Sequence, residues 1–311
     1  MWCYISMKIG VIGNGVHSKR IQKILIKKKL NFYIYKPNKP DYFDKEKLNI
    51  LKKCNVIFLI SPNNTHYNYL KELYRGRYIF CEKPPVNNKK DLKKLKKINS
   101  KKIYFNYNFR FTKISKLIMN KKKYKLGELL YANIISSHGL AKKKEYQKNW
   151  RSNIKKCSKG VYEVVSIHYV DLINFLFNVV SIEKPKLINT SKIGNSYDTS
   201  LVEMKLKNKC IVNIFSTYNS AYCHKLFFLF ENGIIEQKDN VIKISGPSLN
   251  FDKKGFFKAP KKLKKLKVNE NKEYKETLDE SVSYFLTKAR NKKNFNKKNW
   301  VTSIKSNELI L

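Results

Sequence analysis

The sequence predicts an α/β fold, with an N-terminal doubly wound parallel sheet and a C-terminal α+β domain whose sheet is mostly antiparallel. Three observations support this fold class. In the first hundred residues, short apolar runs alternate with basic amphipathic segments, a pattern typical of a parallel sheet covered on both faces. A glycine turn directly follows the first apolar run. After about residue 120, the pattern changes to consecutive short strands separated by turn residues.

The N-terminal elements follow in order from the apolar runs and the helical spacing between them. The expected strands are residues 8–12, 32–35, 56–60, 78–81 and 103–107. The expected helices are residues 18–30, 65–74 and 91–98. We place the domain boundary at residue 120, so that residues 1–120 form the nucleotide-binding domain and residues 121–311 the domain for substrate binding and oligomerisation.

The C-terminal domain is expected to combine a strand, a long helix, a meander and two final helices. The corresponding residues are 127–135, 161–177, 199–245, 273–290 and 298–310. The Lys-rich stretch 253–267 is expected to be an exposed loop. An exposed face of the second sheet would make the protein a homo-oligomer, a dimer or a tetramer.

The charge of the chain is its most unusual property, with 66 Lys and Arg against 23 Asp and Glu and a net charge of +43. Solvated Lys-rich faces are one explanation, and a polyanionic partner such as nucleic acid, acidic lipid or a phosphorylated substrate is the other. The lysines are scattered without an aromatic and Arg stripe, which argues against nucleic acid. No apolar run reaches eighteen residues, so no membrane insertion is expected.

The six cysteines form no CxxC pair and no metal-like spacing with histidine. Several lie in apolar runs, as expected for buried free thiols in a reducing compartment. The N-terminal segment also lacks the features of a secretory signal. We therefore expect a cytoplasmic protein without a metal site.

The glycine turn Gly13-Asn14-Gly15-Val16-His17-Ser18 follows a strand and opens a helix, which is the context of a dinucleotide site. Gly13 permits the tight turn, and Gly15 lets the backbone approach a pyrophosphate at the helix N-terminus. Ser18 replaces the third small residue and is expected to pack closely or cap the helix. A doubly wound domain that binds no nucleotide remains the alternative.

The residue after the second strand bears on the choice between NAD and NADP. An NAD site usually has an acidic residue there for the ribose 2′-hydroxyl, but Tyr35 is followed by Lys36 and no acid occurs before Asp41. Lys36 could contact a 2′-phosphate, which favours NADP over NAD. Because lysine is the commonest residue in the chain, the choice stays open.

Further motifs follow the later strands. They are S-P-N-N-T-H at 61–66, C-E-K-P at 81–84, N-Y-N-F-R at 106–110, N-W-R at 149–151 and the segment 160–171. Over essentially the whole chain, these motifs resemble the Gfo/Idh/MocA family of NAD(P)-dependent oxidoreductases. The resemblance implies a Rossmann domain and reversible hydride transfer between nicotinamide and a hydroxyl or ketone of a sugar, cyclitol or nucleotide-sugar, for example in surface-polysaccharide synthesis.

The resemblance also implies site residues. Lys83 would bind the reacting oxygen and act with His168 in proton transfer. Glu82 would hold a ribose hydroxyl or orient Lys83. The other implied cofactor contacts are Ser61, Pro62, Asn63, His66, Arg110, Trp150 and Arg151, and the other substrate contacts are Tyr107, Glu163 and Asp171. A structural ion pair is the alternative role of each arginine. A structural role at the start of a helix is the alternative for His66, and burial in the interior is the alternative for His168.

One departure from the family pattern concerns the acid that often precedes the histidine by four residues, because this chain has Val164 there. Lys83 and His168 could suffice without it. Glu163 could act if the segment is not a regular helix, since one residue turns an α-helix by about 100°. Alternatively, the protein is a catalytically weak, regulatory cofactor-binding protein. A polyanion or nucleic-acid binder on the same fold has less support, because E-K-P is intact.

Overall fold

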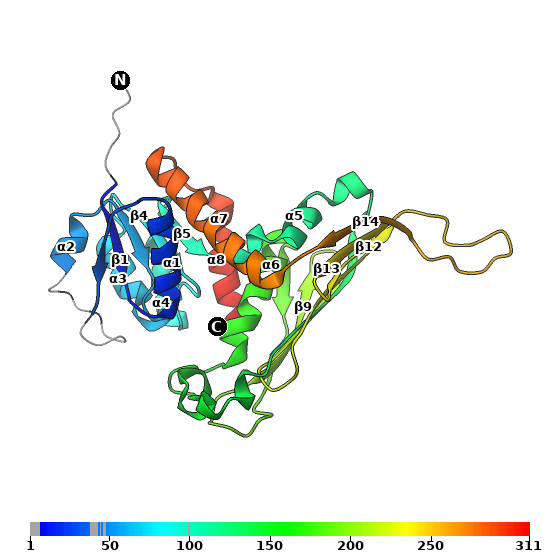
Figure 1. Cartoon of the computed structure of the whole chain (residues 1–311), viewed down its shortest axis with the longest axis horizontal. Coiled ribbons are helices and arrows are strands. Elements are labelled where there is room, and N and C mark those ends of the chain that lie inside the picture. The colour runs from blue at the N-terminus through cyan, green and yellow to red at the C-terminus, as the bar shows by residue number, and fades with distance from the viewer. Residues whose placement is uncertain (1–6, 38–42, 44, 46–47, 99) are drawn as a thin grey trace. The chain divides into compact units, whose positions relative to one another are not determined.

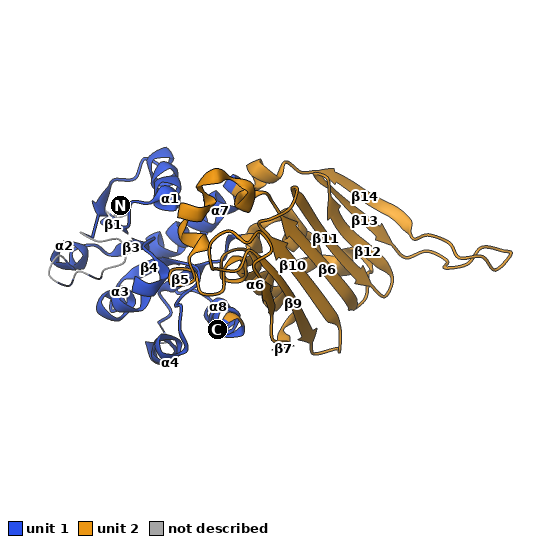
Figure 2. Ribbon diagram, turned by 90° about the horizontal axis from the view of Figure 1, so that it is seen from below, with its two compact units in different colours: residues 1–108, 275–309, 311 blue, residues 109–274, 310 orange. Residues whose placement is uncertain are grey.

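The computed structural model describes residues 7–37, 43, 45, 48–98 and 100–311. The chain forms two compact units, coloured separately in Figure 2. Unit 1 comprises residues 1–108, 275–309 and 311, and unit 2 comprises residues 109–274 and 310. This division differs from the boundary expected at residue 120, because the chain returns to unit 1 with its last two helices.

In the described part of unit 1, five parallel strands form sheet A in the order β2-β1-β3-β4-β5. Figure 1 labels β1, β4 and β5 of this sheet. The strands are β1 (Ile9–Ile12), β2 (Phe32–Tyr35), β3 (Val56–Leu59), β4 (Tyr78–Glu82) and β5 (Ile103–Asn106). Every residue of β1, β3, β4 and β5 is buried. Continuous apolar runs produce such strands when helices cover both faces, so the doubly wound parallel sheet is confirmed.

Helices cover sheet A and complete the core of unit 1. They are α1 (Val16–Lys27), α2 (Leu48–Lys52), η1 (Asn63–Thr65), α3 (His66–Leu73), α4 (Lys89–Ile98), α7 (Glu270–Arg290) and α8 (Lys297–Ile310). Phe285 of α7 packs edge-on against Phe58 and Phe80 of the sheet, with ring centroids 5.2 and 5.4 Å apart. Aromatic contacts of this kind bury a large apolar area, which explains why a helix distant in sequence belongs to unit 1.

In unit 2, the described strands form a nine-stranded sheet B in the order β14-β13-β12-β11-β6-β10-β9-β7, with β8 paired to β9. Only the β6–β10 pair is parallel among these described pairs, so the mostly antiparallel sheet is also confirmed. The strands are β6 (Leu129–Ser137), β7 (Val179–Ile182), β8 (Lys186–Ile188), β9 (Thr199–Leu206), β10 (Ile211–Thr217), β11 (Cys223–Phe230), β12 (Gly233–Lys238), β13 (Val241–Gly246) and β14 (Lys261–Lys267).

Sheet B is covered on one face. Val202 and Ile214 are buried, whereas Leu201 and Ile211 on the opposite face are each 40% exposed. Ser166 attaches the covering segment to the sheet, because its hydroxyl forms hydrogen bonds with the Ser200 and Ser216 hydroxyls of β9 and β10. The helical segments here are η2 (Asn108–Phe111), α5 (Lys113–Met119), η3 (Lys121–Tyr124), η4 (Leu140–Lys142), η5 (Lys144–Lys148), η6 (Trp150–Ser152), η7 (Tyr162–Ser166) and α6 (Ile167–Phe177).

Two expectations for unit 2 need correction. The stretch 253–267 is exposed, but residues 261–267 form strand β14 beside β13 rather than a loop. The helix expected at 161–177 begins with a π-helical turn, η7, before it continues as α6. Separately, none of the described helices is long and apolar enough to cross a membrane.

Candidate cofactor and catalytic site

The candidate site in unit 1 lies at the carboxyl edge of sheet A. Because the strands are parallel, the residues that follow them gather at one edge. The glycine turn follows β1, Lys36 follows β2, Ser61 follows β3 after Ile60, and Lys83 follows β4. The chain order reverses at β1, which lies between β2 and β3. Doubly wound sheets bind nucleotides at such a switch point.

The two glycines of the turn have different structural roles. Gly13 has a φ of +107°, and a Cβ atom there would lie 2.6 Å from the Ile60 carbonyl oxygen. Its amide donates to the Tyr35 carbonyl at 3.0 Å, so Gly13 ties β1 to both of its neighbours. Gly15 is exposed, and a Cβ atom there would meet nothing within 4 Å. The fold itself therefore requires glycine at position 13 but not at position 15.

The N-terminus of α1 has the properties of a phosphate site. No side chain caps it, and its first turn contains no acidic residue, so its free amides and helix dipole favour an anion. Ser18 packs closely as expected, but its hydroxyl donates to the Gly13 carbonyl at 2.8 Å instead of capping the helix. Together with the open space at Gly15, these features fit the pyrophosphate of a dinucleotide.

A buried carboxylate, Glu82, lies at the end of β4. It accepts a hydrogen bond from the Asn106 amide at 2.6 Å and pairs with a ring nitrogen of His17 at 2.8 Å. Ser281 of α7 donates to Asn106 and also bonds the Tyr104 hydroxyl. The sequence motifs did not single out Asn106 as a site residue, and Ser281 carries no local signal because it lies 175 positions from Asn106.

This network fixes the charge of Glu82 and the backbone of Lys83. Burial alone would raise the pKa of Glu82, but His17, Asn106 and the Lys83 charge together lower the pKa below its ordinary value. The carboxylate also accepts the Lys83 amide at 3.3 Å. Glu82 was expected either to hold a ribose hydroxyl or to orient Lys83, and this hydrogen bond to the Lys83 backbone supports the second role. The Lys83 side chain is half-buried.

His66 differs from the expectation that it lines the nicotinamide side. Its side chain is 1% exposed, and its ring nitrogens lie 2.9 Å from the carbonyl oxygens of Ser61 and Pro84. Burial lowers the pKa of His66 despite these contacts. His66 therefore holds the loops after β3 and β4 together. Pro62 is exposed and Asn63 half-buried, so both remain accessible to a ligand.

Lys36 is exposed directly after Tyr35, whose carbonyl binds the glycine turn. The backbone of Lys36 therefore lies next to the residue that bonds the glycine turn, which is the position expected for a residue that contacts a 2′-phosphate. Asp41, the nearest acid along the chain, lies outside the described residues.

Tyr107, expected to contact substrate, is only 1% exposed and belongs to the interior.

Arg110 and Asp171 form a buried ion pair in unit 2. The guanidinium donates to both carboxylate oxygens at 2.8 and 2.6 Å, and the two side chains are 5% and 0% exposed. The expected cofactor role of Arg110 and substrate role of Asp171 are therefore corrected, because each group is the other's partner. Phe175 covers the guanidinium at 4.9 Å from its ring centroid.

The candidate proton-transfer groups of unit 2 lie in η7 and α6. His168 is half-buried and stacks on Phe109, with ring centroids 4.4 Å apart. Because a π-helix bonds residue i to i+5, η7 brings Glu163 closer to the face of His168 than a regular α-helix would. Glu163 is half-buried, and its carboxylate beside the Cys157 thiol contributes, after burial, to raising the pKa of that thiol.

Trp150 and Arg151 belong to unit 2, where the Arg151 guanidinium stacks on the indole at 4.5 Å. Its charge also lies near Tyr218, whose pKa is raised by burial and partly lowered again by Arg151. The same charge lowers the pKa of His138, after the larger effect of burial. Arg151 is thus a half-buried cation in an aromatic setting, while Trp150 is 45% exposed.

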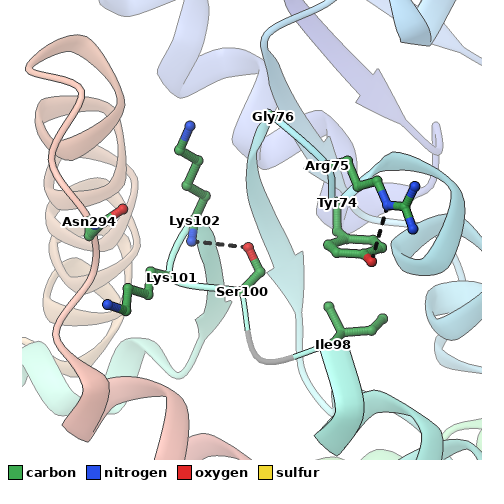
Figure 3. A pocket seen from close by; sticks show the side chains of 8 residues that line it. All are labelled: Tyr74, Arg75, Gly76, Ile98, Ser100, Lys101, Lys102 and Asn294. Carbon is green, nitrogen blue, oxygen red and sulfur yellow. Dashed lines mark hydrogen bonds between the residues drawn. The ribbon is translucent and has the colours of Figure 1, made fainter.

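A separate shallow pocket lies at the amino ends of β4 and β5, the opposite edge of sheet A (Figure 3). It contains none of the predicted site residues; its lining is Tyr74, Arg75, Gly76, Ile98, Ser100, Lys101, Lys102 and Asn294. Across residues 7–37, 43, 45, 48–98 and 100–311, no three His, Cys, Asp or Glu side chains are grouped to hold a metal ion.

Comparison with known families identified two matches. The NAD-binding Rossmann-fold model of the Gfo/Idh/MocA oxidoreductase family matches residues 16–105. The model of the C-terminal alpha/beta domain of that oxidoreductase family matches residues 122–293. A search of curated proteins found no match.

Solved structures of similar fold include three informative examples. A dehydrogenase from Clostridium difficile is 20% identical, with a TM-score of 0.70 and 98% of both chains covered. A myo-inositol dehydrogenase from Corynebacterium glutamicum is 16% identical, with a TM-score of 0.70 and coverage of 98% and 95%. The WlbA dehydrogenase from Bordetella pertussis, in complex with NADH and UDP-GlcNAcA, is 16% identical, with a TM-score of 0.64 and coverage of 75% and 79%. At these identities, the likeness shows the fold.

Proposed function

Because the chain belongs to the Gfo/Idh/MocA oxidoreductases and is an NAD(P)-dependent dehydrogenase acting on CH–OH groups, we propose that its substrate is a sugar, cyclitol or nucleotide-sugar. The observation that carries this proposal is the buried Glu82 network directly before Lys83 at the carboxyl edge of sheet A. Among the similar structures, one is named a myo-inositol dehydrogenase and another holds NADH and UDP-GlcNAcA. The net charge of +43 favours an anionic nucleotide-sugar.

The glycine turn and the α1 N-terminus would hold the pyrophosphate, and Lys36 would bind a 2′-phosphate, which favours NADP. When bound, the nicotinamide supplies or accepts the hydride. In ketone reduction, the Lys83 ammonium donates a hydrogen bond and then its proton to the reacting oxygen, leaving a neutral amine; in alcohol oxidation, the neutral Lys83 amine accepts the hydroxyl proton. Glu82 accepts a hydrogen bond from the Lys83 backbone amide at 3.3 Å. Pro62 and Asn63 would line the nicotinamide side.

His168 would act as the second proton-transfer group, with Glu163 in place of the absent aspartate. The acid would then precede His168 by five residues instead of the four of the family pattern. The i to i+5 bonding of the π-helical turn η7 supports this shift. A second candidate function is regulatory cofactor binding with weak turnover, favoured by Val164.

We also propose that the open face of sheet B pairs copies of the chain.

The test is titration with NADH and NADPH at physiological salt, followed by turnover assays with sugars, cyclitols and nucleotide-sugars. Lys83→Met should bind NADPH like the wild type but turn over about 10²- to 10⁴-fold more slowly, the usual effect of losing an acid–base group. Lys89→Met, at an exposed lysine of α4, is the matched control. Binding without turnover on every substrate would favour the regulatory function. Absence of saturable binding would refute both.

A further inference from the structure

The connection between β13 and β14, residues 247–260, extends past the ends of these two strands in both views (Figures 1 and 2). We call it the tip segment. Residues 247–259 are all exposed. Four large apolar side chains of this segment are exposed: Leu249 is 78% exposed, Phe251 53%, Phe256 67% and Phe257 90%.

The tip segment has a defined conformation. One Asp252 carboxylate oxygen accepts the Lys254 and Phe256 amides at 2.8 and 3.0 Å. The Asp252 amide donates to the Phe256 carbonyl, and Gly255 takes the positive φ of +84° that closes the turn. Phe251 and Phe257 pair across the two chain segments, with ring centroids 5.4 Å apart. The aromatic residues are thus presented by a folded turn.

The surroundings of these aromatic residues are strongly basic. Between residues 247 and 267, the sequence has one acid, Asp252, and eight lysines: 253, 254, 258, 261, 262, 264, 265 and 267. Residues 261–265 and 267 of β14 are exposed. Lysine on an edge strand discourages pairing with another sheet, which explains the lysines of β14. It does not account for three exposed phenylalanines beyond the strand.

We propose that the tip segment binds an anionic lipid bilayer, with Phe256 and Phe257 entering the headgroup boundary and the lysines contacting lipid phosphates. Apolar side chains beside a basic face are the combination that peripheral membrane elements use, and polybasic segments are attracted to anionic leaflets. Pairing with the tip segment of a second copy is disfavoured, because that segment would bring the same cluster of lysines against this one. Nucleic acid is disfavoured because the segment has no arginine.

The experiment measures co-sedimentation of the full-length protein with vesicles of phosphatidylcholine alone and of phosphatidylcholine with phosphatidylglycerol. The wild type should bind only the anionic vesicles. Phe256→Ser/Phe257→Ser should bind at least tenfold more weakly while keeping its circular dichroism spectrum. In a Phe257→Trp variant, brominated lipids should quench the added fluorescence, which reports insertion and not mere attraction.

Charge is tested with a matched pair of triple variants. Lys253→Gln/Lys254→Gln/Lys258→Gln should weaken vesicle binding at least tenfold, whereas Lys89→Gln/Lys90→Gln/Lys93→Gln on α4 removes the same charge and should have little effect. Equal loss in both would overturn the proposal in favour of bulk attraction. Unchanged binding by the serine variant would also overturn it. A lower oligomeric mass of the serine variant in light scattering would also overturn the proposal, because it would identify a second copy of the chain as the partner. If the serine variant lost binding to single-stranded DNA instead of binding to vesicles, the partner would be nucleic acid.

Discussion

Arg110 and Asp171 show how a rare arginine in a sequence motif can be structural. Both groups are almost fully buried and bond in a bidentate geometry. Removing one member would leave an uncompensated buried charge, which destabilises a protein by about 3–5 kcal/mol. We therefore expect Asp171→Asn to lower the free energy of unfolding by this order in urea titrations.

The control replaces both members with apolar residues. Arg110→Met/Asp171→Leu leaves no unpaired charge, so it should be clearly more stable than Asp171→Asn, as seen where buried ion pairs are replaced as a unit. If Asp171→Asn unfolds at the wild-type urea concentration, the pair is not a significant source of stability.

His66 predicts a pH dependence of stability. Its pKa in the folded protein lies below the ordinary value of 6.5 because of burial, so below about pH 6.5 the unfolded chain takes up a proton before the folded chain does. The contribution of neutral His66 is therefore complete above that pH and declines as the pH falls toward the lower, folded pKa. Chemical denaturation between about pH 7 and pH 5 should give a flatter slope for His66→Asn than for the wild type. Identical slopes would contradict the assignment.

At the scale of elements, the π-helical turn η7 bears on catalysis. Its i to i+5 bonding brings Glu163 closer to the face of His168 than a regular α-helix would, and we propose Glu163 as the acid that acts with His168. Glu163→Gln should slow turnover by about 10²-fold or more and remove one limb of the pH–rate profile, with NADPH affinity unchanged. Because we assign the acid to position 163, we expect that Val164→Asp does not restore activity to Glu163→Gln. Full activity of Glu163→Gln would leave Lys83 and His168 as the sufficient pair.

The two glycines of the turn before α1 separate folding from cofactor binding. Gly13→Ala forces a Cβ atom to 2.6 Å from the Ile60 carbonyl at a φ of +107°, so it should lower the unfolding temperature. Gly15→Ala meets nothing within 4 Å and should unfold like the wild type. It should nevertheless weaken NADPH binding at least tenfold, because the methyl group occupies the space left for the pyrophosphate. Normal NADPH affinity in Gly15→Ala would place the phosphates elsewhere.

For the whole molecule, the sequence predicted elements better than tertiary partners. Continuous apolar runs located the strands of sheet A to within one residue at each end, because a parallel sheet buries whole strands. β14 was missed because its Lys-rich sequence lacks buried positions, and its pairing with β13 is decided by the backbone. Arg110 bonds Asp171, which is 61 positions away, and Ser281 bonds Asn106, which is 175 positions away. Local sequence patterns cannot predict contacts over such separations.

The net charge of +43 raises the question of whether the preference for NADPH over NADH depends on one specific lysine or on the summed electrostatic field of all the lysines, called the general field below. Lys36 is exposed beside the glycine turn, so Lys36→Gln should weaken NADPH binding at least tenfold and leave NADH binding unchanged. Lys93→Gln removes the same charge from α4 and should affect neither, because charges beyond about 8 Å are screened at physiological salt. Fluorescence titrations of both cofactors at low and physiological salt decide the matter. If Lys36→Gln and Lys93→Gln weaken both cofactors equally, the general field sets the affinity and Lys36 has no selective role.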